Sequence, residues 1–91
     1  MSYKVQWTSK FKKDYKLCQS RGLDINLLDE VIILLSEGKT LPQKYKDHSL
    51  FGQWKDFREC HIKPDWLLVY AIQNDILTLI LARTGSHSDL F

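Results

Sequence analysis

The sequence predicts an α+β fold in which two N-terminal helices pack on a small, mostly antiparallel sheet. Apolar residues recur every three or four positions in two successive segments of the first half, as on one face of a helix. The second half holds three apolar runs that two short turns separate, which is typical of antiparallel strands. With 91 residues and 44% hydrophobic content, we expect residues 1–91 to form a single domain.

The first half supplies a strand and both helices. Tyr3–Trp7 alternates between apolar and polar residues and predicts a short strand. Thr8 or Ser9 can then cap a helix, and Asp24 can cap the next one. The apolar faces of the two helices comprise Phe11, Tyr15 and Cys18, and then Ile25, Leu28, Val31, Ile32 and Leu35. Both segments end at a glycine, so we expect a pair of helices laid on a sheet.

The second half begins with a loop and continues as a meander. The pattern is lost from Lys39 to Gln53, which is longer than most connections and is typical of functional or mobile loops. Turns at Pro64-Asp65 and at Gln73-Asn74-Asp75 separate the apolar runs that follow. The predicted strands are Trp54–Ile62, Leu67–Ile72 and Ile76–Arg83. Turns this short make consecutive strands antiparallel.

This topology brings polar side chains to one rim of the sheet, because the third strand returns to the edge where the first one ends. The residues expected there are His61, Asp65, Trp66, Arg83 and His87. A lone histidine is usually structural, but two histidines with an arginine and an aspartate at one edge define a candidate active site. On the sequence alone, Trp66 is better explained as a core residue. We expect Phe91 to anchor the C-terminal tail at this rim.

Some other chemistries are excluded or weakly supported. Cys60 and His61 are neighbours on a strand and therefore point to opposite faces, so they cannot form a nucleophile–base pair. Pro64 prevents the helix that would turn His61 and Asp65 into a zinc pair. A metal site built from His48, His61 and His87 remains an open alternative, although their spacing carries no metal signature.

Composition indicates a reduced, cytoplasmic protein. The two cysteines form no disulfide framework or C-x-x-C motif, and no signal peptide or membrane-spanning run is visible. A net charge of +2 is only a weak indication of a nucleic-acid partner. The lysines between Lys10 and Lys16 are better explained as a solvated helix face than as a binding patch.

The stretches "YKDH", "WKDFRECHIKPDW" and "RTGSHSDLF" closely resemble the YafQ-type branch of the RelE/ParE toxin superfamily, over Tyr45 to Phe91. The resemblance implies two helices on a small antiparallel sheet, and a toxin of a type II toxin–antitoxin pair that cleaves mRNA in the ribosomal A site. It implies functional roles for His48, His61, Asp65, Trp66, Arg83, His87 and Phe91. Only the resemblance, and not the predicted topology, assigns His48 to the site.

An enzyme of this kind needs neither metal nor cofactor, because the 2′-hydroxyl of RNA can itself attack the adjacent phosphate. The protein supplies a base, an acid and a cation on the phosphate. The expected roles are His87 as acid, His48 or Asp65 as base, His61 as a supporting group and Arg83 as the cation. Trp66 and Phe91 would contact bases, and Lys46, Lys55 and Lys63 would contact RNA phosphates.

The expected partners are a DinJ/RelB-like antitoxin and the 70S ribosome with its mRNA. Operator DNA would be bound only through the antitoxin complex, and no membrane contact is expected. One alternative is a ParE-like toxin that inhibits a protein target without catalysis, and another is an RNA-binding domain that does not cleave. A purely binding module has no need of imidazoles beside an arginine, so the histidines favour the enzyme.

Overall fold

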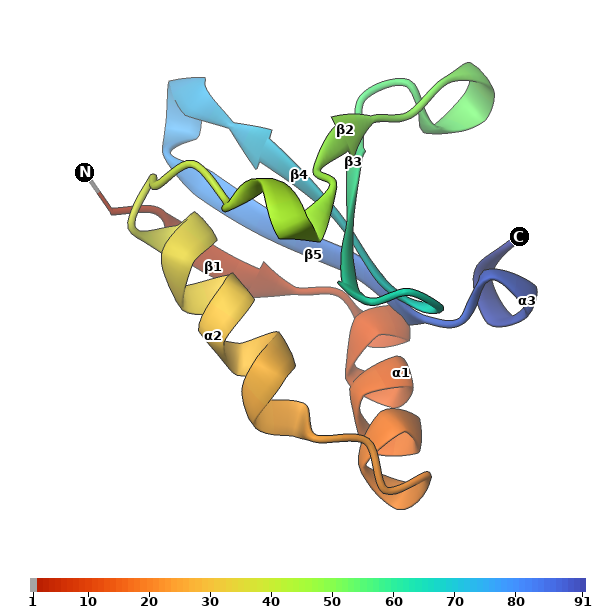
Figure 1. The fold of residues 1–91 in the computed structure, drawn as a ribbon. Helices are drawn as coiled ribbons and strands as arrows, with labels where there is room; N and C mark the ends of the chain where they lie inside the picture. Colours follow the sequence, from red (N-terminus) through yellow and green to blue (C-terminus); the bar gives the residue numbers. More distant parts are fainter. Residues whose placement is uncertain (1) are drawn as a thin grey trace.

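A single five-stranded sheet with the strand order β1-β5-β4-β3-β2 organises the computed structural model, which describes residues 2–91 (Figure 1). The strands are β1 (Lys4–Trp7), β2 (His48–Ser49), β3 (Arg58–Lys63), β4 (Trp66–Gln73) and β5 (Thr78–Gly85). The helices are α1 (Ser9–Ser20), α2 (Ile25–Ser36) and α3 (His87–Leu90), with short 3-10 turns at η1 (Gln43–Tyr45), η2 (Gly52–Trp54) and η3 (Asn74–Ile76). β1 runs parallel to β5, and the other neighbours are antiparallel. The predicted α+β class is confirmed.

The two long helices cover one face of the sheet (Figure 1). Thr8 and Asp24 cap them as predicted, each side chain accepting a hydrogen bond from a backbone N–H of the first turn. Phe11, Leu28 and Val31 are fully buried against strand residues of this face. Within residues 2–91, no helix is long and apolar enough to cross a membrane.

The opposite face of the sheet carries a second, smaller core. Its buried members are Leu67, Val69, Ala82 and Leu90, with the partly buried Leu50, Trp54 and Phe57 packed against them. The segment from Leu50 to Phe57 and helix α3 therefore cover part of this face. Because β4 contacts a core on each side, its residues from Trp66 to Ala71 are all buried. This explains why the run WLLVYA shows no alternation.

Three predicted boundaries need correction. The expected loop from Lys39 to Gln53 contains the two-residue strand β2, which pairs with Arg58 and Glu59. The first strand of the meander begins at Arg58 and not at Trp54, because the chain turns through η2 first. The third begins at Thr78 and not at Ile76, because Leu77 adopts a left-handed backbone conformation (φ 48°) after η3.

The C-terminal tail is held by Leu90 and Asp89, whereas Phe91 was the predicted anchor. Leu90 is 9% exposed, and Phe91 is 57% exposed with its ring against Trp54 at 5.9 Å between centroids. Asp89 accepts hydrogen bonds from the backbone N–H of Ser86 and from Arg21 Nη1 at the end of α1 (2.7 Å). The Ser86 hydroxyl accepts from the Asp89 N–H, which completes a capping box. The final turn is therefore tied both to itself and to α1.

Alanine substitutions of Leu90 and Phe91 test which of the two residues anchors the C-terminal tail. We expect Leu90→Ala to lower the free energy of unfolding by about 2 kcal/mol, since it removes buried methyl groups at the rim of a core. Phe91→Ala, the matched control, should change it by less than about 0.5 kcal/mol because the ring is largely exposed. Urea unfolding followed by circular dichroism measures both. Equal losses in the two variants would contradict the assignment of Leu90 as the anchor.

The Asp89 carboxylate should make part of the stability depend on pH. Its hydrogen bond with Arg21, and then those with Ser86, lower the pKa of Asp89 to about 2. The folded-state pKa lies below the unfolded value of about 3.9, so this stabilisation is complete above pH ~4 and lost as pH falls towards 2. Asp89→Asn should therefore reduce stability at neutral pH by about 1 kcal/mol, the pair being solvent-screened, and by less near pH 2. A constant difference from pH 7 to pH 2, measured by urea unfolding, would contradict this role.

Candidate active site

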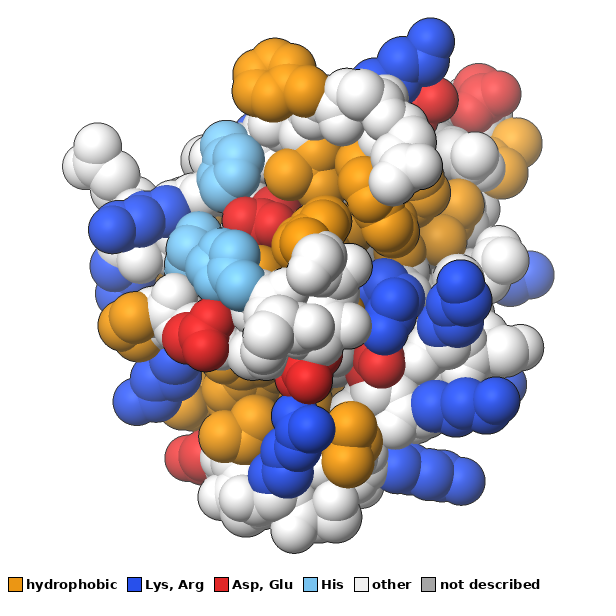
Figure 2. Space-filling view, turned by 90° about the vertical axis from the view of Figure 1, so that its right-hand side faces the viewer, with side chains coloured by type: hydrophobic (Ala, Val, Ile, Leu, Met, Phe, Trp, Pro, Cys, Tyr) orange, Lys and Arg blue, Asp and Glu red, His pale blue; other side chains and the backbone are white. Residues whose placement is uncertain are grey.

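Three histidines from three separate segments form a row on the face of the sheet opposite the long helices. This histidine row comprises His48 of β2, His61 of β3 and His87 of α3. Ring centroids are 6.2 Å apart between His48 and His61, and 5.9 Å between His61 and His87. Figure 2 shows the histidines gathered around an acidic side chain, beside an apolar patch. The predicted convergence of His61 and His87 is confirmed, and β2 brings His48 to the same place.

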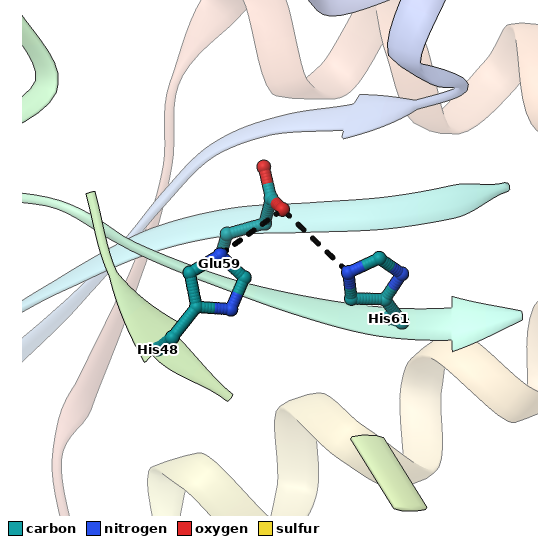
Figure 3. A group of neighbouring side chains, drawn as sticks. All are labelled: His48, Glu59 and His61. Atoms are coloured by element: carbon teal, nitrogen blue, oxygen red, sulfur yellow. Dashed lines mark ion pairs between the residues drawn. The ribbon is translucent and has the colours of Figure 1, made fainter. Parts of the chain in front are cut away.

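Glu59 connects two members of the row and was not predicted. Its Oε1 lies 3.4 Å from His48 Nε2 and 3.7 Å from His61 Nε2, as the dashed lines in Figure 3 show. The residue is only 5% exposed. The two-residue spacing from His61 on one strand was the available signal, because it places both side chains on the same face. We call His48, Glu59 and His61 the Glu59 cluster.

Backbone carbonyls orient both imidazoles of the Glu59 cluster. His48 Nδ1 lies 2.7 Å from the carbonyl oxygen of Lys46, and His61 Nδ1 lies 3.3 Å from that of Pro64. A carbonyl only accepts hydrogen bonds, so each Nδ1 carries the hydrogen there. Each Nε2 then faces Glu59. A proton on either Nε2 would therefore lie next to the carboxylate of Glu59, which can compensate its positive charge.

His87 has a carboxylate of its own. Asp65 Oδ1 accepts from both His87 Nδ1 (2.9 Å) and the His87 backbone N–H (3.1 Å). These two hydrogen bonds lower the pKa of Asp65 below its usual value, because both are donated to the ionised carboxylate. With Nδ1 engaged, Nε2 is the nitrogen of His87 that remains for a substrate. Both side chains are more than half exposed, at 56% for His87 and 70% for Asp65.

A partly buried hydrogen-bond network holds β2, and hence His48, in place. Asp47 accepts from the Tyr70 hydroxyl and, at 3.0 Å, from Arg58 Nη2. Burial first, and then the bond to Asp47, raises the pKa of the Tyr70 hydroxyl well above its usual value, so it remains a donor. Because neighbours on a strand face opposite ways, fixing Asp47 towards the helices directs His48 towards Glu59.

Two predicted site residues have other positions. Trp66 is 3% exposed and donates from its indole N–H to Thr84 Oγ1, so it is a core residue and cannot stack on bases. Arg83 donates to Asp14 of α1 from Nε (2.7 Å) and Nη2 (3.2 Å). The predicted free guanidinium fork is therefore already bound to a carboxylate. Topology predicted the end of the strand correctly but could not predict which partner α1 would offer.

The remaining predicted RNA contacts are all exposed. Phe91 presents its ring beside Trp54, near the end of the histidine row that His87 forms. Lys46 and Lys63 line a cavity next to His61, and Lys55 follows η2 on the segment that covers the second core. The exposure of these side chains is compatible with the predicted contacts but does not test them.

The Glu59 cluster also has the composition of a metal site. Its two imidazole nitrogens and carboxylate oxygen all lie within 4.8 Å of one another. Two histidines and a glutamate are a known donor set for Zn²⁺, so the cluster fits such an ion. The open alternative from the sequence combined His48 and His61 with His87. The structure groups Glu59 with them, while His87 is bound to Asp65.

Comparison with known proteins agrees with this fold. Residues 3–91 match the family described as "Bacterial toxin of type II toxin-antitoxin system, YafQ". The mRNA interferase toxin YafQ of Escherichia coli strain K12 is 39% identical over 96% of this chain and 94% of that protein. The crystal structure of the E. coli DinJ–YafQ toxin–antitoxin complex matches with a TM-score of 0.91 and 38% identity, covering 100% of this chain and 99% of that chain.

A metal-bound toxin from Helicobacter pylori matches with a TM-score of 0.92 and 49% identity over 100% of both chains. The protein is thus a toxin of a type II toxin–antitoxin system. Within that class, the chain belongs to the YafQ family. The resemblance stated from the sequence motifs is therefore confirmed.

Proposed function

We propose that this toxin is an endoribonuclease that cleaves mRNA in the ribosomal A site and so blocks translation. One observation carries the proposal: imidazoles with separate carboxylate partners lie next to one another in a single row. His48 and His61 share Glu59, and His87 has Asp65. That is the arrangement that general acid–base cleavage of RNA requires. The name of the 39% identical E. coli relative, an mRNA interferase toxin, supports the same activity.

The proposed reaction is an in-line attack of a ribose 2′-hydroxyl on the adjacent phosphorus. His48 or His61 accepts the 2′-hydroxyl proton on Nε2, and Glu59 compensates the charge that forms. His87 Nε2 gives a proton to the 5′-oxygen as the P–O bond breaks. The products are a 2′,3′-cyclic phosphate and a 5′-hydroxyl end. Asp65 keeps His87 in the required tautomer, so we assign it this orienting role in place of the alternative role as base.

Arginine and lysine side chains would stabilise the negative charge of the phosphate. Arg83 uses Nε and Nη2 for Asp14, which leaves Nη1 for another acceptor. The exposed Lys46 and Lys63 near His61 are further sources of positive charge. Phe91 is proposed to hold a base beside His87, and Lys55 to contact the RNA backbone.

The proposed chemistry requires no metal ion or other cofactor. An ion held by the Glu59 cluster would bind the Nε2 lone pairs of His48 and His61, which are the atoms that accept the proton. Metal binding by the cluster and its role as base are therefore mutually exclusive. The related H. pylori toxin is described as metal-bound, so at least one toxin of similar fold binds a metal ion.

The proposed partners follow from the same activity. A small antitoxin would bind and silence the toxin, as the DinJ–YafQ complex of the E. coli relative suggests. Operator DNA would be bound only through that complex. We place the toxin in the cytoplasm, where ribosomes and mRNA are found.

Cleavage should depend strongly on the ribosome. A net charge of +2 is small for binding free RNA, so we expect the ribosome to hold and orient the mRNA. Orientation alone can contribute roughly 7–11 kcal/mol of barrier reduction in ideal cases. We expect fast cleavage of one transcript on programmed ribosomes and slow cleavage of the naked transcript, with primer extension locating the cut.

Two controls accompany this comparison. A transcript with a 2′-deoxy residue at the cut should resist cleavage, since the attacking hydroxyl is missing. EDTA should not inhibit the slow cleavage of naked RNA, where no ribosome requires Mg²⁺. Equal rates on both substrates would contradict ribosome dependence, and cleavage of the deoxy substrate would exclude the proposed attack.

Replacing the acid should abolish activity while the fold remains. His87→Ala removes an exposed side chain that contributes little to either core, so unfolding should be nearly unchanged. Loss of a general acid typically lowers the rate 10²- to 10⁴-fold. Single-turnover cleavage on ribosomes measures this, and co-purification with the antitoxin shows that the fold is intact. Persistent toxicity without cleavage would favour the ParE-like alternative.

A further inference from the structure

A cavity of about 340 Å³ opens beside the Glu59 cluster, at the edge of β3. It lies where α2, η1 and the β3–β4 turn meet, and its apolar walls come from Leu27, Tyr45, Ile62 and Pro64. β2 pairs only with Arg58 and Glu59, so the outer edge of β3 beyond them has no strand partner among residues 2–91. The volume falls within the roughly 300–1,000 Å³ range of small-ligand sites. We call it the Lys44 cavity.

The charge around the Lys44 cavity has one sign. Lys44, Lys46 and Lys63 all line it, and no carboxylate does. All three lysines are exposed. The Lys44 ammonium lies 5.1 Å from the centre of the Tyr45 ring, at the aromatic wall. Apolar and aromatic walls with several ammonium groups suit a flat base that carries phosphates on either side.

The cavity meets the proposed active site at His61, whereas His48 and Glu59 are not among its lining residues. His61 is one of its lining residues. Lys46, which also lines it, gives its backbone carbonyl to His48 Nδ1, and Pro64 gives its carbonyl to His61 Nδ1. His87 is not among the lining residues. A ligand in the cavity would thus lie next to His61, one of the two imidazoles proposed to accept the 2′-hydroxyl proton, and away from the proposed acid.

We propose that the Lys44 cavity binds the base of the nucleotide on the 5′ side of the cut, whose 2′-hydroxyl attacks. The base packs against Tyr45 and Pro64, while Lys44 and Lys63 contact the flanking phosphates. This inference rests on the proposed ribonuclease function and adds to it the site that selects and positions the attacking nucleotide. Neither Lys44 nor Tyr45 was a candidate in the sequence analysis.

The test is a double-mutant cycle between the protein and the message. After primer extension has located the cut, one transcript carries an abasic residue immediately 5′ of it. Loss of a stacked base should slow the wild type about 5- to 150-fold on programmed ribosomes. Tyr45→Ala should slow cleavage of the intact transcript, yet lose little further rate on the abasic one. Additive effects of the two changes would overturn the proposal.

A second pair of variants changes only exposed side chains, so their effects on cleavage should not arise from loss of folding. Lys44→Glu changes an exposed side chain and should slow cleavage and lessen its dependence on salt. Lys4→Glu is the matched control, because Lys4 is exposed on β1 at the opposite edge of the sheet. Equal slowing by both variants would show a general charge effect and overturn the proposal. Loss of antitoxin binding by Lys44→Glu with unchanged cleavage would assign the cavity to the antitoxin instead.

Nuclear magnetic resonance measures nucleotide binding to the cavity independently of RNA cleavage. Ribonucleoside 3′-monophosphates at millimolar concentration should shift the backbone amides of residues 44–46 and 61–63 in the wild type, and less so in Lys44→Glu. Absence of such shifts would overturn the proposal even if mRNA on programmed ribosomes is cleaved efficiently. Shifts at these amides, in a protein that cuts no message, would support a nucleotide site while refuting the proposed function.

Discussion

The alternation of side chains along β3 is the constraint on which both the core and the candidate site depend. Cys60 and Ile62 face the long helices and are buried, whereas Glu59 and His61 face the other way. A slip of one residue in the pairing of β3 would exchange these sets, placing an imidazole and a carboxylate in an apolar core. Burial of Cys60 and Ile62 therefore fixes the positions of Glu59 and His61.

The neighbouring strands keep this register from both sides. On one side, Cys60 is opposite Leu68 and His61 is opposite Leu67 in β4. Each of these directly paired residues therefore lies on the same face of the sheet as its partner. On the other side, His48 is opposite Glu59, which brings the second imidazole to the same carboxylate. β2 has only two residues, and the bonds of Asp47 to Tyr70 and Arg58 supply the specificity that so short a ladder lacks.

Structural elements that depend on local interactions were predictable from the sequence. Features that depend on a single partner distant in the sequence were not. Helix caps and tight turns act over a few residues, so the helices and the meander were predictable from Thr8, Asp24 and Pro64. β2 has no local signal, since two residues cannot show a period. The inward position of Trp66 depends on Thr84, and the engagement of Arg83 depends on Asp14, 69 residues earlier in the chain. Glu59 was missed because a glutamate on a strand is normally solvated, whereas this one is 5% exposed and lies beside His48 and His61.

The two halves of the site are attached to the fold with very different strength. The Glu59 cluster lies on the sheet over a packed core, but His87 belongs to a four-residue helix, which is too short to be stable alone. Its position depends on the capping box, on Leu90 and on the bond between Asp89 and Arg21, which is exposed to solvent. Gly85 allows this turn to close, since a Cβ there would lie 3.0 Å from Asp89 Oδ2. Local opening of so small a unit costs less than global unfolding. The position of His87 beside the Glu59 cluster therefore depends on the few contacts that tie the final turn to α1 and to the second core.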